Sequence, residues 1–327
     1  MKALALFSGG LDSMIAIKLI TNQSIHVKAI NINIGFGGTK DMSEVFKQRA
    51  GAAGADFEVI DAREEYLQKV LFNPKYGYGK RFNPCIDCHA FMMIKAKELL
   101  EKEGADFIIT GEVLGQRPMS QNQKALKNVL ELSGDDALVL RPMSAKLLAP
   151  TTPEINGWVD REKLLDIQGR DRKRQIALAK EFDFKEYASP GGGCLLTDIY
   201  FSAKLRDFIK YQPLRAEDIA LLKIGRHFRF EHGAKMVLGR NENENNVLEK
   251  LANSTFLNIF LKDDIPAPYG KISKNATQEE KILAAKCALS YTKIDKTKPH
   301  QVQIGDEIFE VCALEDREIL KQYAVGI

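Results

Sequence analysis

The sequence predicts an α/β fold, in which a domain built on a mainly parallel sheet is followed by a smaller α+β domain. The 327 residues exceed what one hydrophobic core usually takes. The first half alternates short β-branched runs with amphipathic stretches, which is typical of βαβ units. The second half carries hairpin signals and mixed strands. We therefore expect domains at 1–200 and 215–327, joined by a linker at 201–214.

The first half supplies its strands and helices in alternation. Because parallel sheets bind ligands at the carboxyl ends of their strands, functional residues are expected directly after the strands. The expected strands are 3–7, 27–32, 57–61, 107–110 and 137–140. The expected helices, from apolar residues at helical spacing, are 12–21, 42–53, 63–70, 89–103 and 172–182.

The second half begins with a predicted connecting helix at 201–209. A hairpin follows, with strands at 227–230 and 235–238 around the turn Glu231-His232-Gly233. Further strands are expected at 256–261, 302–304 and 308–311, and one helix at 277–291. This mixture of elements predicts the α+β domain.

Composition and charge limit the classes of function. The 47 basic and 44 acidic residues leave a net charge of +3, so any nucleic-acid binding would come from local patches. No apolar run approaches the roughly 18 residues that a membrane span needs. The apolar stretch 3–7 is too short for a secretory signal. We therefore expect a soluble, cytoplasmic protein with no membrane partner, and the oligomeric state stays open.

The strongest local signal is the segment Ser8-Gly9-Gly10-Leu11-Asp12-Ser13, between the first strand and the first helix. Two glycines let the backbone wrap closely around an anion, and the N–H groups that open the helix point at it. Ser8 and Ser13 add hydroxyl donors, while Asp12 can hold a magnesium ion that bridges phosphate oxygens. The alternative is a simple glycine turn with a capped helix.

Three of the five cysteines lie in polar, glycine- or proline-containing surroundings. Cys85 and Cys88 form a C-x-x-C at the start of a predicted helix, and Cys194 follows three glycines. A helix N-terminus favours the thiolate, which is both the nucleophile and the metal ligand. Three cysteines suit a cluster with an open coordination position or a persulfide pair, whereas zinc would need a fourth ligand such as His89. Cys287 and Cys312 are expected in the core.

The Ser-Gly-Gly-Leu-Asp-Ser segment resembles the PP-loop of the ATP pyrophosphatases, which adenylate a substrate oxygen and expel pyrophosphate. Together with Asn-Pro-Cys-x-x-Cys and the later Gly-Gly-Cys, residues 1–200 resemble the tRNA sulfur-transferases, namely the 2-thiouridylases and 4-thiouridine synthetases. One departure is Gly111-Glu112, where 2-thiouridylases have Gly-His. The resemblance implies ATP binding with Mg²⁺ at Ser8, Gly9, Gly10, Leu11, Asp12, Ser13 and Gly111, catalysis by Asp12, Cys88 and Cys194, and a [4Fe–4S] cluster, or else zinc, at Cys85, Cys88 and Cys194.

The C-terminal half resembles the NFACT-R domain, which contacts tRNA in ribosome quality-control factors. The resemblance rests on Gly225-Arg226-His227-Phe228 and on the run from Lys235 to Asn246. Arg226, Arg229, Lys235 and Arg240 could follow phosphates, whereas Phe228 and Phe230 either face RNA or lie in the core. Residues 168–174 form the densest basic cluster, for which solvated surface charge is the alternative. The predicted RNA contacts are Arg170, Arg172, Lys173, Arg174, Arg226 and Arg240.

These patterns together predict an ATP-dependent tRNA sulfurtransferase that adenylates a base carbonyl oxygen and replaces it with sulfur. Its partners would be tRNA and a sulfur donor, either a cysteine desulfurase relay or sulfide. Two other functions stay open. One is a PP-loop ligase or amidase that acts on a small molecule and holds structural zinc. The other is a non-catalytic tRNA-binding factor in which the C-terminal half dominates.

Overall fold

The computed structural model describes residues 1–134, 137–188, 193–263 and 265–326. The chain forms two compact units, Met1–Gly193 and Cys194–Ile327. The division falls before the predicted boundary at residue 200, and the segment predicted as a linker is largely a helix of the second unit. That helix belongs to the second unit because its apolar face is buried, with Phe201, Leu205 and Phe208 almost fully covered. In the described ranges, no helix is both long and apolar enough to cross a bilayer.

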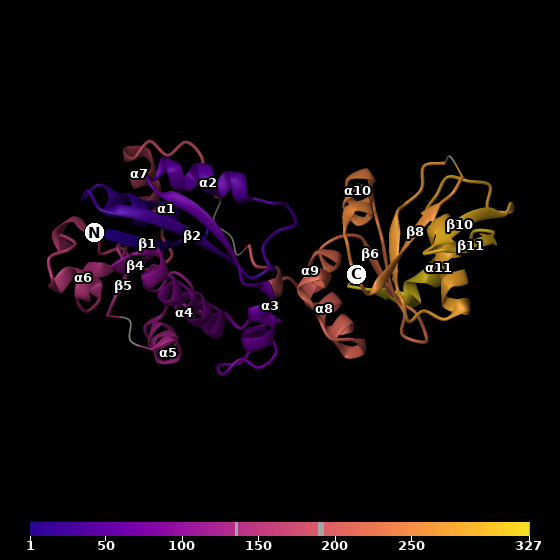
Figure 1. The fold of residues 1–327 in the computed structure, drawn as a ribbon, viewed down its shortest axis with the longest axis horizontal. Helices are drawn as coiled ribbons and strands as arrows, with labels where there is room; N and C mark the ends of the chain where they lie inside the picture. The colour runs from indigo at the N-terminus through magenta and orange to yellow at the C-terminus, as the bar shows by residue number, and fades with distance from the viewer. Residues whose placement is uncertain (135–136, 189–192, 264, 327) are drawn as a thin grey trace. The chain divides into compact units, whose positions relative to one another are not determined.

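The first unit is built on a five-stranded sheet with the order β3-β2-β1-β4-β5, in which all neighbours are parallel. Helices α1, α2 and α7 lie on one face of this sheet and α4 and α5 on the other (Figure 1). Its strands are β1 (Lys2–Leu6), β2 (His26–Asn33), β3 (Asp56–Asp61), β4 (Phe107–Thr110) and β5 (Val139–Leu140). Its α-helices are α1 (Leu11–Thr21), α2 (Ser43–Ala52), α3 (Arg63–Tyr66), α4 (Cys85–Glu103), α5 (Gln123–Ser133), α6 (Thr152–Ile155) and α7 (Lys173–Glu181). A π-helical turn, η1 (Leu67–Leu71), continues α3, and short 3-10 turns lie at η2 (Ala145–Leu147) and η3 (Arg161–Lys163).

The position of α1 in the core follows from its sequence. Most of its residues are buried, and Met14, Ile15 and Ile17 are among the least exposed side chains of the molecule. A helix that is apolar around most of its circumference is stable only inside a core. Helix α1 therefore holds the segment before it firmly against the carboxyl end of β1.

The second unit carries a seven-stranded antiparallel sheet with the order β11-β10-β8-β9-β7-β6-β12. Its strands are β6 (Arg226–Arg229), β7 (Lys235–Leu238), β8 (Phe256–Leu261), β9 (Gly270–Ser273), β10 (His300–Ile304), β11 (Glu307–Val311) and β12 (Ala324–Val325). Its helices are α8 (Ile199–Tyr211), α9 (Ala216–Leu222), α10 (Glu242–Lys250) and α11 (Gln278–Ser290), with 3-10 turns η4 (Leu195–Thr197) and η5 (Arg317–Tyr323). The predicted fold class, a parallel α/β domain followed by an α+β domain, is confirmed.

The predicted hairpin of the second unit forms, and the structure decides between the two alternatives for its phenylalanines. Phe228 and Phe230 are both about 2% exposed and belong to the core, so the alternative in which they face RNA is wrong. The polar run after Gly239 opens α10, where the Asn241 side chain accepts a hydrogen bond from the Glu244 N–H and caps the helix.

Candidate functional site

The glycine turn lies between β1 and α1, as predicted, and its backbone needs glycine. Gly9 has a φ of +72°, and a Cβ there would lie 2.3 Å from the ring of Phe46. Gly10 is extended and precedes α1, and no side chain caps the helix. The first N–H groups of α1 are therefore directed at a space that an anion can occupy.

The remaining predicted residues of this turn have distinct places. Ser8 is exposed, and its hydroxyl oxygen lies 3.4 Å from the Gly10 N–H. The Ser13 hydroxyl donates a 2.7 Å hydrogen bond to the Gly10 carbonyl and so braces the turn. Leu11 is a core residue, 1% exposed, and only its backbone can face a ligand.

Asp12 presents one carboxylate oxygen that the protein leaves without a hydrogen bond. Its Oδ2 accepts a 2.7 Å hydrogen bond from Nε2 of Gln116. Its Oδ1 is buried and has no hydrogen-bond partner, and it lies 3.8 Å from Nη2 of Arg172. Buried carboxylate oxygens are normally satisfied, so this arrangement fits a magnesium ligand for a nucleotide phosphate.

Further buried polar atoms without hydrogen bonds belong to residues that contact the same turn or its partner Gln116. Arg49 donates from Nη1 to the Gly9 carbonyl at 2.9 Å, while its Nε has no hydrogen-bond partner. The same is true of Nε of Arg172 and of Oε1 of Gln175, whose amide donates to Gln116. Native interiors contain few such atoms. Their gathering around one turn is the mark of a site that a polar ligand completes.

Gly111 brings the loop after β4 against the glycine turn. Strands β1 and β4 are neighbours at the point where the strand order reverses, which is where open α/β sheets bind ligands. A Cβ on Gly111 would lie 2.6 Å from the backbone nitrogen of Ser13, so only glycine allows this approach. Further along the same loop, the Gln116 side chain donates its hydrogen bond to Asp12. Leu114 in turn pairs with Gln168, which brings the segment of Arg172 to the same place.

The cysteine pair lies in the first turn of α4, which begins at Cys85, four residues before the predicted start. Cys85 and Cys88 are partly exposed, and Nδ2 of Asn83 donates to Sγ of Cys85 at 3.2 Å. The other end of α4 lies at the amino end of β1, where Nζ of Lys2 donates to the Glu103 carbonyl. The cysteines therefore lie at the carboxyl edge of the sheet, together with the glycine turn.

A buried charged group connects the cysteine turn with the loop after β4. Glu112 is 6% exposed and accepts 3.0 Å hydrogen bonds from Nδ1 of His89 and from Nε of Arg141. Burial alone would raise the pKa of Glu112. The charge of Arg141, together with the hydrogen bond to His89, outweighs burial and lowers this pKa to about 2. Glu112 is therefore a fixed negative charge that orients His89, the residue after Cys88.

Sequence reasoning missed this group. It treated Glu112 as a departure from the Gly-His pattern and His89 only as a zinc candidate. A carboxylate two residues after a buried strand, with an arginine directly after the next strand, was the available signal. Gln116, Arg49 and Gln175 were also missed, because nothing in their local sequence marks them.

Cys194 is the first residue of the second unit, and it is partly exposed. The preceding glycines at 191–192 lie outside the described residues. Before them, Ala188 forms a parallel bridge with Gly10, so the chain runs beside the glycine turn shortly before it reaches Cys194. Among the described side chains, no three His, Cys, Asp or Glu residues are grouped as metal ligands would be. The predicted iron–sulfur or zinc site therefore stays a prediction.

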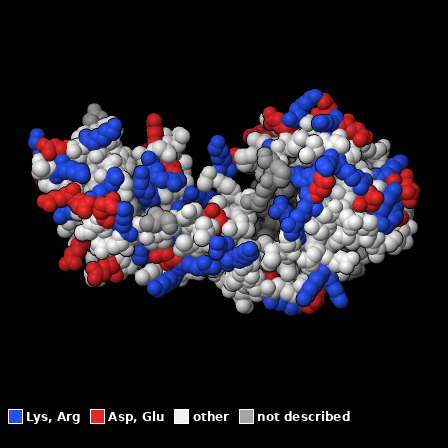
Figure 2. All heavy atoms as spheres, turned by 180° about the vertical axis from the view of Figure 1, so that it is seen from behind, with Lys and Arg blue, Asp and Glu red and all other residues white. Residues whose placement is uncertain are grey.

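The basic residues predicted to contact RNA fall into two groups. Arg170, Lys173 and Arg174 are exposed, although Arg174 pairs with Asp166 at 2.7 Å. Arg172 differs, because it turns inward to Asp12. Figure 2 shows basic and acidic side chains interspersed on the face it presents, without one dominant basic surface.

In the second unit, the basic side chains that were predicted to contact RNA interact with neighbouring groups of the protein. Arg226 donates to the Gly239 carbonyl at 2.9 Å and lies over the ring of Tyr291, and Arg240 pairs with Glu244. Arg229 and Lys235 both pair with Asp207 and are almost fully buried, so the prediction that they follow phosphates is wrong.

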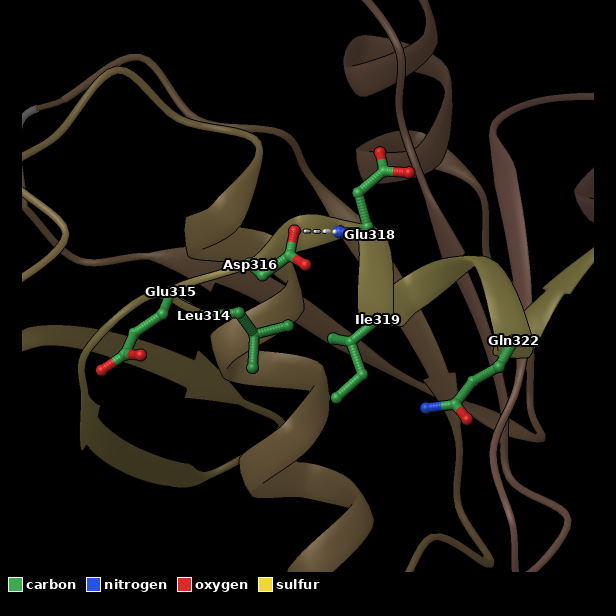
Figure 3. A pocket seen from close by; sticks show the side chains of 6 residues that line it. All are labelled: Leu314, Glu315, Asp316, Glu318, Ile319 and Gln322. Carbon is green, nitrogen blue, oxygen red and sulfur yellow. Dashed lines mark hydrogen bonds between the residues drawn. The ribbon is translucent and has the colours of Figure 1, made fainter.

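The second unit also has a shallow pocket of about 630 Å³ beside η5 (Figure 3). It holds none of the predicted site residues, and carboxylates contribute much of its lining. An acidic pocket of this kind repels phosphate, so it is no candidate for the nucleotide site. Its lining residues are Leu314, Glu315, Asp316, Glu318, Ile319 and Gln322.

Comparison with protein-family models gives two matches. Residues 2–79 match the argininosuccinate synthase N-terminal HUP domain. Residues 225–324 match the NFACT protein RNA binding domain. The two matches fall on the first and second units respectively, which agrees with the resemblances stated from the sequence.

Curated relatives match the first unit over part of their own length. The tRNA-specific 2-thiouridylase MnmA of Petrotoga mobilis is 29% identical over 130 residues, which is 35% of each chain. The probable tRNA sulfurtransferase of Thermococcus kodakarensis is 28% identical over 173 residues, covering 51% of this chain and 39% of that one. The argininosuccinate synthase of Metallosphaera sedula is 25% identical over 135 residues, covering 40% and 34%. The chain thus spans about a third of the length of these relatives, and its resemblance to tRNA thiolation enzymes is confirmed.

Proposed function

We propose that the chain is an ATP-dependent tRNA sulfurtransferase, which adenylates a carbonyl oxygen of a base and replaces that oxygen with sulfur. One observation carries the proposal. The His89–Glu112 hydrogen bond joins the cysteine turn to the loop whose Gly111 packs on the backbone of Ser13. Nucleotide-binding and sulfur-handling groups therefore share one edge of one sheet. The similarity to named tRNA thiolation enzymes supports RNA as the substrate.

In the first step, the glycine turn and the N–H groups of α1 hold the phosphates of ATP. The base carbonyl oxygen attacks the α-phosphorus, the bond to the β-phosphate oxygen breaks, and pyrophosphate leaves. Asp12 would hold Mg²⁺ through Oδ1, and the ion supplies positive charge beside the phosphates. Arg49 and Arg172, whose Nε–H groups have no hydrogen-bond partner, provide further donors for the leaving pyrophosphate.

In the second step, the terminal sulfur of a persulfide on Cys88 or Cys194 attacks the activated ring carbon, and AMP leaves. The other cysteine then attacks the sulfur that stays on the enzyme, so the S–S bond breaks and a disulfide between the two cysteines remains. Ala188 lies beside Gly10, and six residues of chain reach at most about 20 Å. The proposed sulfur transfer requires Cys194 to reach the glycine turn across this segment. A cysteine desulfurase relay supplies this sulfur by persulfide exchange, and a dithiol reductant then reduces the disulfide to complete the cycle. Where sulfide is the donor, it attacks the disulfide left by the previous turnover, which regenerates the persulfide on one cysteine and the thiol on the other without a reductant.

The test separates the two steps. Asp12→Ala should abolish tRNA-dependent exchange of labelled pyrophosphate into ATP, whereas Cys194→Ala should keep exchange and lose incorporation of labelled sulfur into tRNA. Cys312→Ala changes a partly exposed cysteine that directly follows β11 in the second unit, so it serves as the matched cysteine control and should keep both activities. Thiolated tRNA made by Cys194→Ala would contradict the sulfur route, and unchanged exchange by Asp12→Ala would contradict the ATP site.

A PP-loop ligase that acts on a small molecule is the second candidate. The match of residues 2–79 to the argininosuccinate synthase HUP domain favours it. Pyrophosphate release distinguishes the two candidates, because tRNA should stimulate it in a sulfurtransferase and an amino acid should stimulate it in such a ligase. Binding of tRNA without any pyrophosphate release would instead favour the non-catalytic factor.

A further inference from the structure

The segment that leads into the cysteine helix is unusually rich in aromatic and basic residues. We call residues 72–82, which connect η1 to α4, the aromatic loop. Nothing in the proposed adenylation or sulfur transfer uses this loop. Two of its rings are well exposed, Phe72 at 43% and Tyr78 at 40%, although large apolar side chains on a surface cost solvation free energy. Its aromatic and basic residues are Phe72, Lys75, Tyr76, Tyr78, Lys80, Arg81 and Phe82.

The exposed rings are held in place by a buried ring beneath them. Phe82 is 8% exposed and contacts both, at centroid distances of 6.5 Å to Phe72 and 4.7 Å to Tyr78. The Tyr78 hydroxyl also donates a 2.7 Å hydrogen bond to the Leu71 carbonyl. These contacts restrain the two exposed rings, so less conformational entropy is lost when a planar group stacks on them.

The backbone of the aromatic loop is fastened to the first turn of α4. The buried carboxylate of Asp87 accepts hydrogen bonds from the backbone N–H groups of Lys75 at 2.6 Å and Tyr76 at 3.1 Å. The Asn83 carbonyl accepts from the Gly79 N–H at 2.9 Å. Asn83 and Asp87 lie on either side of Cys85 in sequence, so the loop and the cysteine pair form one rigid piece.

The charge of the loop favours a polyanion over an apolar protein partner. Lys80 is exposed and follows Tyr78 by two residues in the sequence. Lys75 contributes little charge, because its Nζ lies 2.9 Å from the carboxylate of Glu131, to which the Tyr76 hydroxyl also donates. Aromatic faces beside basic side chains are the combination by which proteins hold single-stranded nucleic acid, with bases on the rings and phosphates on the cations.

We infer that the aromatic loop binds unpaired RNA nucleotides, with bases stacked on Phe72 and Tyr78 and a backbone phosphate at Lys80. The inference rests on the proposed function in taking RNA as the substrate. It adds the place where the strand enters, directly beside Cys85 and Cys88. The bases held there are the neighbours of the base that reacts, which must itself leave the stack to reach the ATP and the cysteines.

The test measures RNA binding by fluorescence anisotropy, without ATP. The probe is a short fluorescein-labelled RNA hairpin with a uridine-rich loop, and a blunt RNA duplex of the same length is the comparison. Phe72→Ala and Tyr78→Ala should each weaken hairpin binding about tenfold, which is the usual loss per stacked base. Duplex binding should change little, because its bases are not available for stacking. Lys80→Ala should lower the salt dependence of hairpin binding by about one phosphate contact.

Two controls keep the result interpretable. Phe72→Tyr keeps an aromatic ring at position 72 and should keep hairpin affinity. Ile155→Ala removes an apolar side chain that is 72% exposed elsewhere in the first unit and should have no effect. Fluorescence of the single tryptophan, Trp158, reports whether each variant is folded. If the wild-type chain binds the hairpin and the ring variants bind it equally well, the inference is wrong and the proposed function stands. If the wild-type chain binds neither the hairpin nor tRNA, both fail.

Discussion

Replacing Glu112 with glutamine removes one negative charge from the buried group Arg141–Glu112–His89 and keeps the shape of the side chain. Glu112 and Arg141 are each only 8% exposed in their side chains, so water screens their interaction weakly. In the variant, Arg141 stays buried and loses its ion pair with Glu112. Removing one partner of a buried ion pair is strongly destabilising, because the charge of the other partner stays buried without that compensation.

The pKa of Glu112 gives the magnitude. Its value of about 2 in the folded protein, against an ordinary 4.5, corresponds to about 3 kcal/mol of stabilisation above pH 4.5. Because the folded pKa is the lower one, this stabilisation is complete above pH 4.5 and is lost as the pH falls toward 2. At pH 3 about 1 kcal/mol should remain. The difference between the wild-type chain and Glu112→Gln should therefore shrink on acidification.

Urea denaturation followed by tryptophan fluorescence measures this difference in the first unit. Trp158 is the only tryptophan and packs near Phe107 in the core of that unit, at a ring distance of 6.4 Å. Glu162→Gln is the matched control, since Glu162 is 85% exposed and pairs with Lys146 at the surface, and it should cost less than about 1 kcal/mol. A loss below about 1 kcal/mol for Glu112→Gln at pH 7, or a loss that does not change between pH 7 and pH 3, would refute the reasoning.

Two other expectations follow from single residues. Gly9→Ala should abolish ATP binding in a calorimetric titration and destabilise the first unit by about 1–3 kcal/mol, because the added Cβ clashes with Phe46 and the φ of Gly9 is positive. Gly38→Ala is the control and should behave as wild type, because a Cβ at Gly38 would have nothing within 4 Å. ATP binding by Gly9→Ala would contradict the assigned turn. Burial raises the pKa of the Cys287 thiol, so native protein treated with iodoacetamide at pH 8 should be alkylated at Cys85 well before Cys287 in peptide mass spectra, and equal rates would contradict this.

The parallel sheet could be predicted because its signals are local. Each strand is a short apolar run and each crossover a helical pattern, so β1 to β4 lie within one residue of their expected positions. Helix α5 was missed, although Asn122 caps it and apolar residues recur at helical spacing. Strand β9 could not be found locally. It begins with Gly270 and carries Lys271, and only pairing with β7 and β8 makes it a strand.

The glycine turn was also predictable, because its proposed function depends on a backbone conformation that the Gly9-Gly10 pair indicates in the sequence. The partners of Asp12 were not. Arg172 belongs to a dense basic run, and local reasoning assigns every member of such a run to the surface. Only the pairing of Leu114 with Gln168 turns this one arginine inward, and that pairing joins residues far apart in the sequence.

The chain has Glu112 where the Gly-His pattern has histidine, and in the structure this glutamate binds another histidine, His89. Gly111 must be glycine because of its approach to Ser13, so the residue after it always lies between the glycine turn and the first turn of α4. In this chain that residue is a carboxylate, and it holds the imidazole of His89 at the same edge. The imidazole therefore belongs to α4, directly after Cys88, whereas the Gly-His pattern would place a histidine in the loop after β4. Because Arg141 keeps Glu112 ionised, His89 cannot lose its anchor at any pH near neutrality. An edge that lacks the Gly-His pattern in sequence therefore still presents a fixed histidine beside the cysteines.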